Sequence, residues 1–259
     1  MIYTLLALSL FGAFFSGLLG VGGAVILIPL LLTVPKLLGV GELSMHEVAG
    51  LTMLQVLAAS VTGWLIHRRS GFGHMGTTLS IGIPMGLFSF VGAVLSKSMS
   101  EQAMLFIFGC LVIFAFLMLL RKSHNESIET KEFEFKQLHS VISGGCVGFF
   151  AGVVGAGGGF ILMPVMIKLL NIPIRVAVGS SLGVLFIGAL MGSFGKIMTL
   201  QVEWLYLLPV IAGSLPGSML GASVSRKISP TRLRHTLLII VLLILIKTWY
   251  DLYHIYMPG

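Results

Sequence analysis

Two glycine-rich segments, far apart in the chain, share one residue pattern. Residues 14–29 read FFSGLLGVGGAVILIP and residues 149–164 read FFAGVVGAGGGFILMP, with nine of sixteen positions identical. Glycine permits tight turns and lets a ligand approach the backbone closely. After Gly22-Gly23 and Gly157-Gly158-Gly159 the sequence becomes apolar and compatible with a helix. The start of each helix would present free N–H groups and a positive dipole end, which suit a small oxyanion.

Close packing is the alternative explanation for these glycines, because small residues let membrane helices approach one another. Their density, duplication and position in the middle of apolar segments favour an ion or substrate site. Duplicated apolar segments interrupted by glycine are the sequence pattern that marks the binding sites of transporters.

Hydroxyl and amide side chains follow each glycine-rich segment. Ser180 and Ser181 stand near the start of an apolar run, and Leu51 and Thr52 are their counterparts in the first half of the chain. Gln55 lies one helical turn beyond Thr52. Such groups can hydrogen-bond a polar substrate without the cost of a buried charge. Helix capping or hydrogen bonds between helices explain them equally well.

Acidic residues are absent from the deep parts of the apolar runs, since every Asp and Glu lies near a segment end or in a hydrophilic stretch. Cation pumps and proton-coupled carriers use intramembrane carboxylates. An anion or a neutral substrate is therefore favoured over a metal cation. Without a cluster of metal ligands or paired carboxylates, we expect no enzyme activity, metal or cofactor. Lys196 ends its apolar run, and we expect its side chain to extend to the membrane interface.

The composition indicates a polytopic membrane protein. Of the 259 residues, 56% are hydrophobic and 10% are charged, whereas soluble domains carry roughly 25% charged residues. The net charge of +7 raises nucleic acid as a partner. However, the Lys and Arg residues lie in short loops between apolar runs, as in membrane proteins. We expect an all-α chain in the lipid bilayer of the cell membrane and no nucleic-acid partner.

The chain divides into two halves. Eight apolar runs are separated, four from four, by the hydrophilic segment RKSHNESIETKEFEFK at 121–136. We expect a first transmembrane repeat at 1–121, a cytoplasmic linker at 122–137 and a second repeat at 138–259. The glycine-rich segments match with an offset of 135 residues. Two later motifs, 49–53 with 178–182 and 92–96 with 221–225, match with an offset of 129.

The first run of each half is about 32 residues long, whereas a bilayer takes about 20 helical residues. Each run is either one broken, tilted helix or a re-entrant hairpin that turns at its glycines. Eight straight spans place eight Lys and Arg residues on each side of the membrane. Two hairpins and six full spans place twelve on one side and only Lys36, Lys97, Lys196 and Lys247 on the other. The positive-inside rule favours the hairpins. The halves then become inverted repeats, with both termini outside.

The sequence resembles the TauE/SafE family of sulfite exporters over essentially its whole length. The resemblance rests on GLLGVGGAVILIP, GVVGAGGGFILMP, the following AVGSSL and the two four-segment halves. It implies export of sulfite, sulfonates or related organosulfur anions without an organic cofactor. The candidate substrate-binding residues are Gly20, Gly22, Gly23, Thr52, Gln55, Gly155, Gly157, Gly158, Gly159, Ser180 and Ser181. Ala24 replaces the third glycine in the first half, so we expect the two half-sites to differ.

These observations predict a secondary transporter that exports a small anion bound at paired glycine-rich helix breaks near the bilayer midplane. A passive anion channel and a non-transporting membrane partner or assembly protein are the alternatives. The sequence leaves open which anion is carried, how transport is coupled and whether the chain forms a homodimer.

Overall fold

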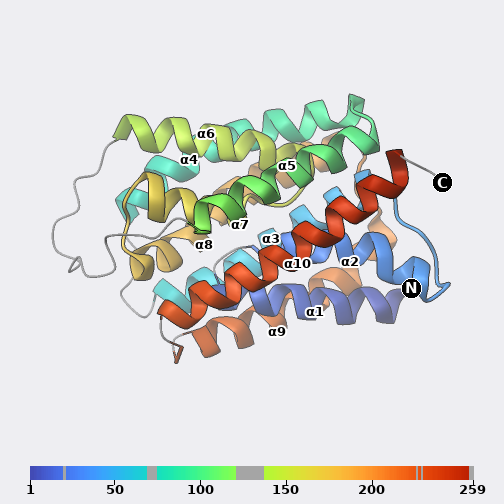
Figure 1. The fold of residues 1–259 in the computed structure, drawn as a ribbon, viewed down its shortest axis with the longest axis horizontal. Helices are drawn as coiled ribbons and strands as arrows, with labels where there is room; N and C mark the ends of the chain where they lie inside the picture. The colour runs from blue at the N-terminus through green and yellow to red at the C-terminus, as the bar shows by residue number, and fades with distance from the viewer. Residues whose placement is uncertain (20–21, 69–74, 121–136, 226, 229, 257–259) are drawn as a thin grey trace.

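The computed structural model describes residues 1–19, 22–68, 75–120, 137–225, 227–228 and 230–256, which form helices and short connections. The predicted linker at 122–137 lies outside the described residues except for its last position. Figure 1 shows the arrangement of the helices. They are α1 (Ile2–Leu19), α2 (Ala24–Leu37), α3 (Met45–Arg68), α4 (Met75–Leu95), the 3₁₀ turn η1 (Ser96–Ser98), α5 (Glu101–Leu120), α6 (Gln137–Val154), α7 (Gly159–Pro164), the π-helical turn η2 (Val165–Leu169), α8 (Ile174–Met198), α9 (Trp204–Ser225) and α10 (Pro230–Tyr256).

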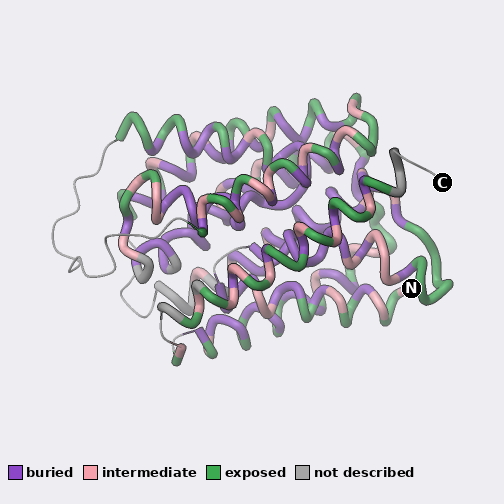
Figure 2. Tube along the Cα trace, in the orientation of Figure 1, coloured by how far each residue is buried: buried purple, intermediate pink, exposed green. Residues whose placement is uncertain are grey.

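Seven helices in the described part of the chain are long and apolar enough to cross a bilayer. Large apolar side chains also cover the outer surface, among them Phe114, Leu208 and Ile246. Figure 2 shows such exposed positions alternating with buried ones along α10. A soluble protein would not expose so much continuous apolar surface. The predicted all-α, multi-pass membrane protein is confirmed.

The chain folds back on itself at the first glycine-rich segment. Gly23 lies against the backbone of Gly12, and its ideal Cβ position is 2.9 Å from the Cβ atom of Ser16. The loop after α2 returns to the start of α1, where Gly41 lies against the Met1 side chain. The two helices α1 and α2 are therefore antiparallel (Figure 1).

The second glycine-rich segment folds in the same way. The ideal Cβ position of Gly158 lies 2.9 Å from the Cβ atom of Ala151 in the preceding helix, α6. In Figure 1, α1 begins at the end of the molecule where α10 finishes, whereas α6 begins at the opposite end. The two pairs of helices, α1 with α2 and α6 with α7, thus enter the protein from opposite ends.

Glycine lets two pairs of helices pack backbone to backbone. In the α1–α9 pair, a Cβ atom at Gly17 would meet the Ser218 carbonyl oxygen and lie 2.8 Å from the Ala222 nitrogen. In the α6–α4 pair, a Cβ atom at Gly152 would meet the Ser89 carbonyl oxygen and lie 2.8 Å from the Ala93 nitrogen. Gly152 follows Gly17 by 135 residues. Ser218 and Ala222 follow Ser89 and Ala93 by 129 residues.

This packing predicts that Gly152→Ala destabilises the protein. The added methyl group would meet backbone atoms of α4, which cannot move aside as a flexible side chain can. Overpacking of this kind costs about 1–3 kcal/mol. The melting temperature of purified protein in detergent should fall by several degrees. Cys146→Leu, which adds bulk at an exposed position of the same helix, is the control. Equal melting temperatures for the two variants would contradict the close packing.

Candidate functional site

Both predicted breaks coincide with glycines in the left-handed backbone region. Gly22 and Gly23 have φ angles of 82° and 69°, and Gly23 directly precedes α2. Gly155, Gly157 and Gly158 have φ angles of 77°, 61° and 71°. This region costs other residues roughly 1–2 kcal/mol. The third glycine of the second segment differs, because Gly159 is already the first residue of α7. Gly20 lies outside the described residues.

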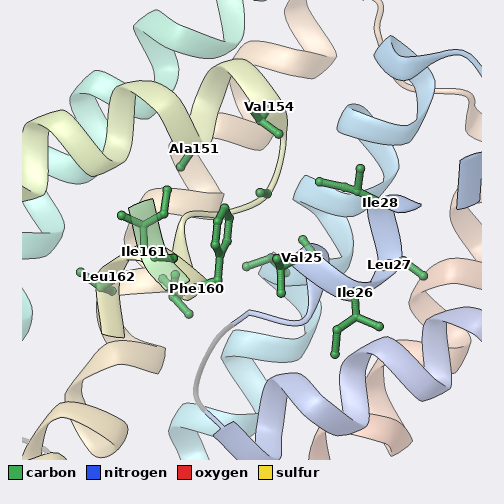
Figure 3. Close-up of a cluster of buried hydrophobic side chains, with 14 of the residues drawn as sticks. Val25, Ile26, Leu27, Ile28, Ala151, Val154, Phe160, Ile161 and Leu162 are labelled. Carbon is green, nitrogen blue, oxygen red and sulfur yellow. The ribbon is translucent and has the colours of Figure 1, made fainter. Parts of the chain in front are cut away.

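Apolar side chains fill the space around the two helix starts. Figure 3 shows Val25 from α2 and Phe160 from α7 within one cluster of buried side chains. These residues occupy the same position in the two glycine-rich segments. Phe160 also packs edge-to-face on Phe108 of α5, with ring centroids 6.0 Å apart.

Helix α3 contacts both breaks. The Cγ1 atom of Val56 lies 3.4 Å from the ideal Cβ position of Gly22 and 2.5 Å from that of Gly157. Leu185 of α8 lies 3.5 Å from the same position of Gly22. Val56 and Leu185 are both fully buried. These two side chains therefore close the space between the breaks, a role that the sequence did not indicate.

Thr52 joins α3 to the second break. Its single hydroxyl proton is shared between hydrogen bonds to the Gly155 carbonyl oxygen at 2.9 Å and to the Val48 carbonyl oxygen of its own helix at 2.7 Å. Thr52 is fully buried. The first of these bonds satisfies a carbonyl group that the interrupted helix α6 leaves without an ordinary partner.

Gln55 is fully buried, but neither its Nε2 nor its Oε1 atom has a hydrogen-bond partner in the described part of the chain. Each unsatisfied buried polar group costs roughly 1–3 kcal/mol. Thr52 lies one helical turn before both Gln55 and Val56 on α3, three and four residues away. An amide placed there can donate to and accept from a ligand. It is the one predicted site residue whose hydrogen-bonding capacity is unused among those described.

Ser180 and Ser181 are fully buried near the start of α8, which packs against α3. The structure thus brings Thr52 and Gln55 of α3 and the two serines of α8 to two adjoining helices. Ser16 was missed by the sequence reasoning. Its Oγ atom is buried without a described partner, and its Cβ atom lies beside Gly23. A serine within an apolar helix gives no sequence signal that distinguishes it from a packing residue.

The expectation for Lys196 is wrong. Its side chain is fully buried, and it donates hydrogen bonds to Ser96 Oγ at 2.7 Å, Gln201 Oε1 at 2.9 Å and the Val153 carbonyl oxygen at 3.2 Å. The ammonium group does not extend to the interface because these three acceptors replace its water. Lys196 therefore ties together α8, η1, the α8–α9 connection and the last turn of α6.

The described residues contain no group of three His, Cys, Asp or Glu side chains that could hold a metal ion. The polar groups near the breaks are hydroxyls, an amide and backbone atoms. They form a neutral, dehydrated environment that suits a small polar ligand better than a metal cation.

Comparisons with known proteins place this chain in a family. The family model described as Sulfite exporter TauE/SafE matches residues 5–248. "Probable membrane transporter protein YunE" of Bacillus subtilis is 25% identical over 93% of this chain and 94% of its own. A "Probable membrane transporter protein" of Xylella fastidiosa is 28% identical over 85% of this chain and 83% of its own. The corresponding values for "Probable membrane transporter protein MJ0441" of Methanocaldococcus jannaschii are 24%, 85% and 84%. No solved structure matches the chain significantly.

The hydrogen bond between Thr52 and Gly155 predicts that Thr52→Val destabilises the second break. Valine keeps the shape but leaves a buried carbonyl group with one partner fewer, at a cost of about 1 kcal/mol. The melting temperature in detergent should fall. Ser223→Ala is the matched control, because that exposed hydroxyl bonds only within its own helix, to Met219. If Thr52→Val melts at the same temperature as this control, the bond does not support the break.

Proposed function

The chain belongs to the sulfite exporter TauE/SafE family, and we propose that it exports a small sulfur oxyanion through the two glycine breaks. It is a multi-pass transporter of the cell membrane and not an enzyme. The proposed substrate is sulfite, a sulfonate or a related organosulfur anion. The observation that carries the proposal is the buried, unpartnered amide of Gln55 on the helix that contacts both breaks.

The environment of the breaks supports an anion as the substrate. A helix N-terminus presents N–H groups and a partial positive charge, and Gly23 caps α2 without a side-chain hydrogen bond. Buried hydroxyl groups at Thr52, Ser180 and Ser181 add neutral polar atoms on α3 and α8, the two helices whose side chains contact Gly22. No carboxylate of the described residues is buried there to repel a negative charge.

The two halves of the chain act, in this proposal, as inverted repeats at 1–121 and 138–259, each with a re-entrant hairpin and three full spans. The opposite directions of α1 and α6 support it (Figure 1). So do the paired contacts of Gly17 and Gly152, which repeat with the two offsets of the sequence motifs. Inverted repeats that meet at broken helices are a common basis for alternating access.

A carrier mechanism is favoured over a passive channel by the closure of the site. Thr52 and Gln55 are fully buried, and Val56 and Leu185 fill the space beside the breaks. A channel requires a continuous polar path, whereas a carrier passes through a closed state. A membrane potential, negative inside, contributes about 2.3 kcal/mol per elementary charge per 100 mV. That potential alone can drive an anion outward.

Flux into and out of proteoliposomes tests this function. For the wild type we expect saturable, potential-dependent flux of sulfite, thiosulfate or sulfoacetate. Gly22→Leu and Gly157→Leu should each abolish this flux, because the added side chain would meet Val56 and strain the backbone. Gly39→Asn is the control: Gly39 also has a positive φ angle, but it lies in a loop with open space around it. Asparagine tolerates that conformation.

Two results would count against the proposal. Undiminished flux in both leucine variants would remove the breaks from the transport path. An absence of flux with purified wild-type protein for every sulfur anion tested would favour a non-transporting role.

The membrane orientation is tested by reporter fusions. We expect reporters fused to either terminus to lie outside the cell and a reporter inserted between residues 121 and 136 to lie in the cytoplasm. In this orientation twelve of the sixteen Lys and Arg residues face the cytoplasm, as the positive-inside rule requires. Enzymatic reporters that are active on only one side of the membrane give the measurement. A cytoplasmic C-terminus would contradict the hairpins.

A further inference from the structure

Each glycine break ends in two left-handed glycines, Gly22-Gly23 and Gly157-Gly158, but the side chain beside the last of them differs. At the first break, the Cβ atom of Ser16 lies 2.9 Å from the ideal Cβ position of Gly23. At the second break, Ala151 lies at the same distance from that of Gly158. The Oγ atom of Ser16 is fully buried and has no hydrogen-bond partner in the described residues. An alanine occupies the equivalent position at the second break, so the fold itself does not require this hydroxyl group.

Gln55 shows the same asymmetry on the helix that contacts the breaks. Its counterpart in the second half, 129 residues later, is Val184, which is fully buried. An apolar side chain therefore fits the equivalent place. A glutamine with both ends of its amide unpartnered is retained only in the first half.

Gln55 directly precedes Val56, whose side chain contacts Gly22 of the first break. It precedes Thr62 by seven residues, or two helical turns, so the two side chains share one stripe of the helix. Thr62 hydrogen-bonds with Ser218 of α9. The carbonyl group of Ser218 in turn packs against Gly17 of α1, next to Ser16. Thr62 therefore faces α9 where α9 packs against α1, and Gln55 lies on the same stripe of α3.

Single serine hydroxyls without described partners also occur at Ser9, Ser89 and Ser193. A serine can lose its partner at little cost by turning its hydroxyl toward its own helix. A glutamine cannot do so, and among the described residues only Gln55 leaves an amide nitrogen and an amide oxygen both unpartnered.

We infer that the substrate binds at the first break alone, between Ser16, Gln55 and the start of α2, and that it carries both an O–H group and acceptor oxygens. The inference rests on the proposed transport function. The Gln55 nitrogen would donate to a ligand oxygen, and the Gln55 oxygen would accept from the ligand's O–H group. A singly protonated, monovalent oxyanion such as hydrogensulfite has this combination.

The same chemistry narrows the proposed range of sulfur anions to those that carry an O–H group. Sulfate and methanesulfonate carry only acceptor oxygens at neutral pH, so either would leave the Gln55 carbonyl oxygen unpartnered in a dehydrated site. A site built to pair with a ligand O–H group discriminates strongly against analogues that lack it. Sulfate, as a dianion, also loses more hydration on entry.

The decisive experiment combines flux and thermal stability for Ser16→Ala and Gln55→Met. In proteoliposomes at mildly acidic pH, where sulfite carries one proton, each variant should raise the KM for sulfite about tenfold. Each should melt at the wild-type temperature or above it, because an apolar side chain of similar shape removes an unsatisfied polar group. Ser89→Ala, an equally buried and unpartnered serine at the α4–α8 contact, should keep the wild-type KM. Methanesulfonate should inhibit sulfite flux through the wild type at least about tenfold more weakly than it inhibits flux through Gln55→Met.

Binding is measured separately, as the rise in melting temperature of detergent-purified protein with added hydrogensulfite. The inference expects this rise in the wild type and in Ser89→Ala, and its loss in Gln55→Met. An unchanged KM in both test variants, with normal wild-type flux, would overturn the inference and leave the transport function standing. Stabilisation that depends on Gln55 without flux would support the site and contradict transport. If the wild-type protein shows no flux and is not stabilised by hydrogensulfite, both the inference and the transport function are overturned.

Discussion

A helix that stops inside a lipid bilayer leaves backbone groups that water cannot reach, and the protein must supply their partners. The rest of this structure depends on that constraint. The helical chain is interrupted twice, before α2 and before α7, each time at left-handed glycines, and the proposed hairpins place both interruptions within the membrane. At the second stop Thr52 donates to the Gly155 carbonyl oxygen. Helix α3 lies against glycines of both stops, and Leu185 of α8 lies against Gly22.

Burial of the breaks determines how the remaining helices pack. The helices that precede the breaks, α1 and α6, must lie close to neighbours that shield them, and glycine permits this approach. Gly17 and Gly152 bring these helices into backbone contact with α9 and α4. The outer helices α5 and α10 then cover the returning helices, α7 and α2, and present apolar side chains to lipid. Lys196 secures the end of α6 by donating to the Val153 carbonyl oxygen.

The sequence predicted the features that come from the backbone and from segment length. Runs of about 32 apolar residues with central glycines had to break, because a bilayer takes about 20. Thr52 and Gln55 stood out as polar residues in an apolar run. Other features depend on contacts between distant segments. The burial of Lys196 requires acceptors from Ser96 and Gln201. The closing role of Val56 follows only from the position of α3 across both breaks.

Comparison of the halves separates what the fold needs from what it does not. Positions that are identical, such as Gly23 and Gly158, carry backbone conformations that both breaks require. Positions that differ while their contacts stay the same cannot be fixed by the fold. Ser16 and Ala151 make the same contact with their glycines, yet only the serine leaves a polar atom unsatisfied. An unsatisfied buried group lowers stability. A binding site for one asymmetric ligand requires such a polar group at one break and not at the other.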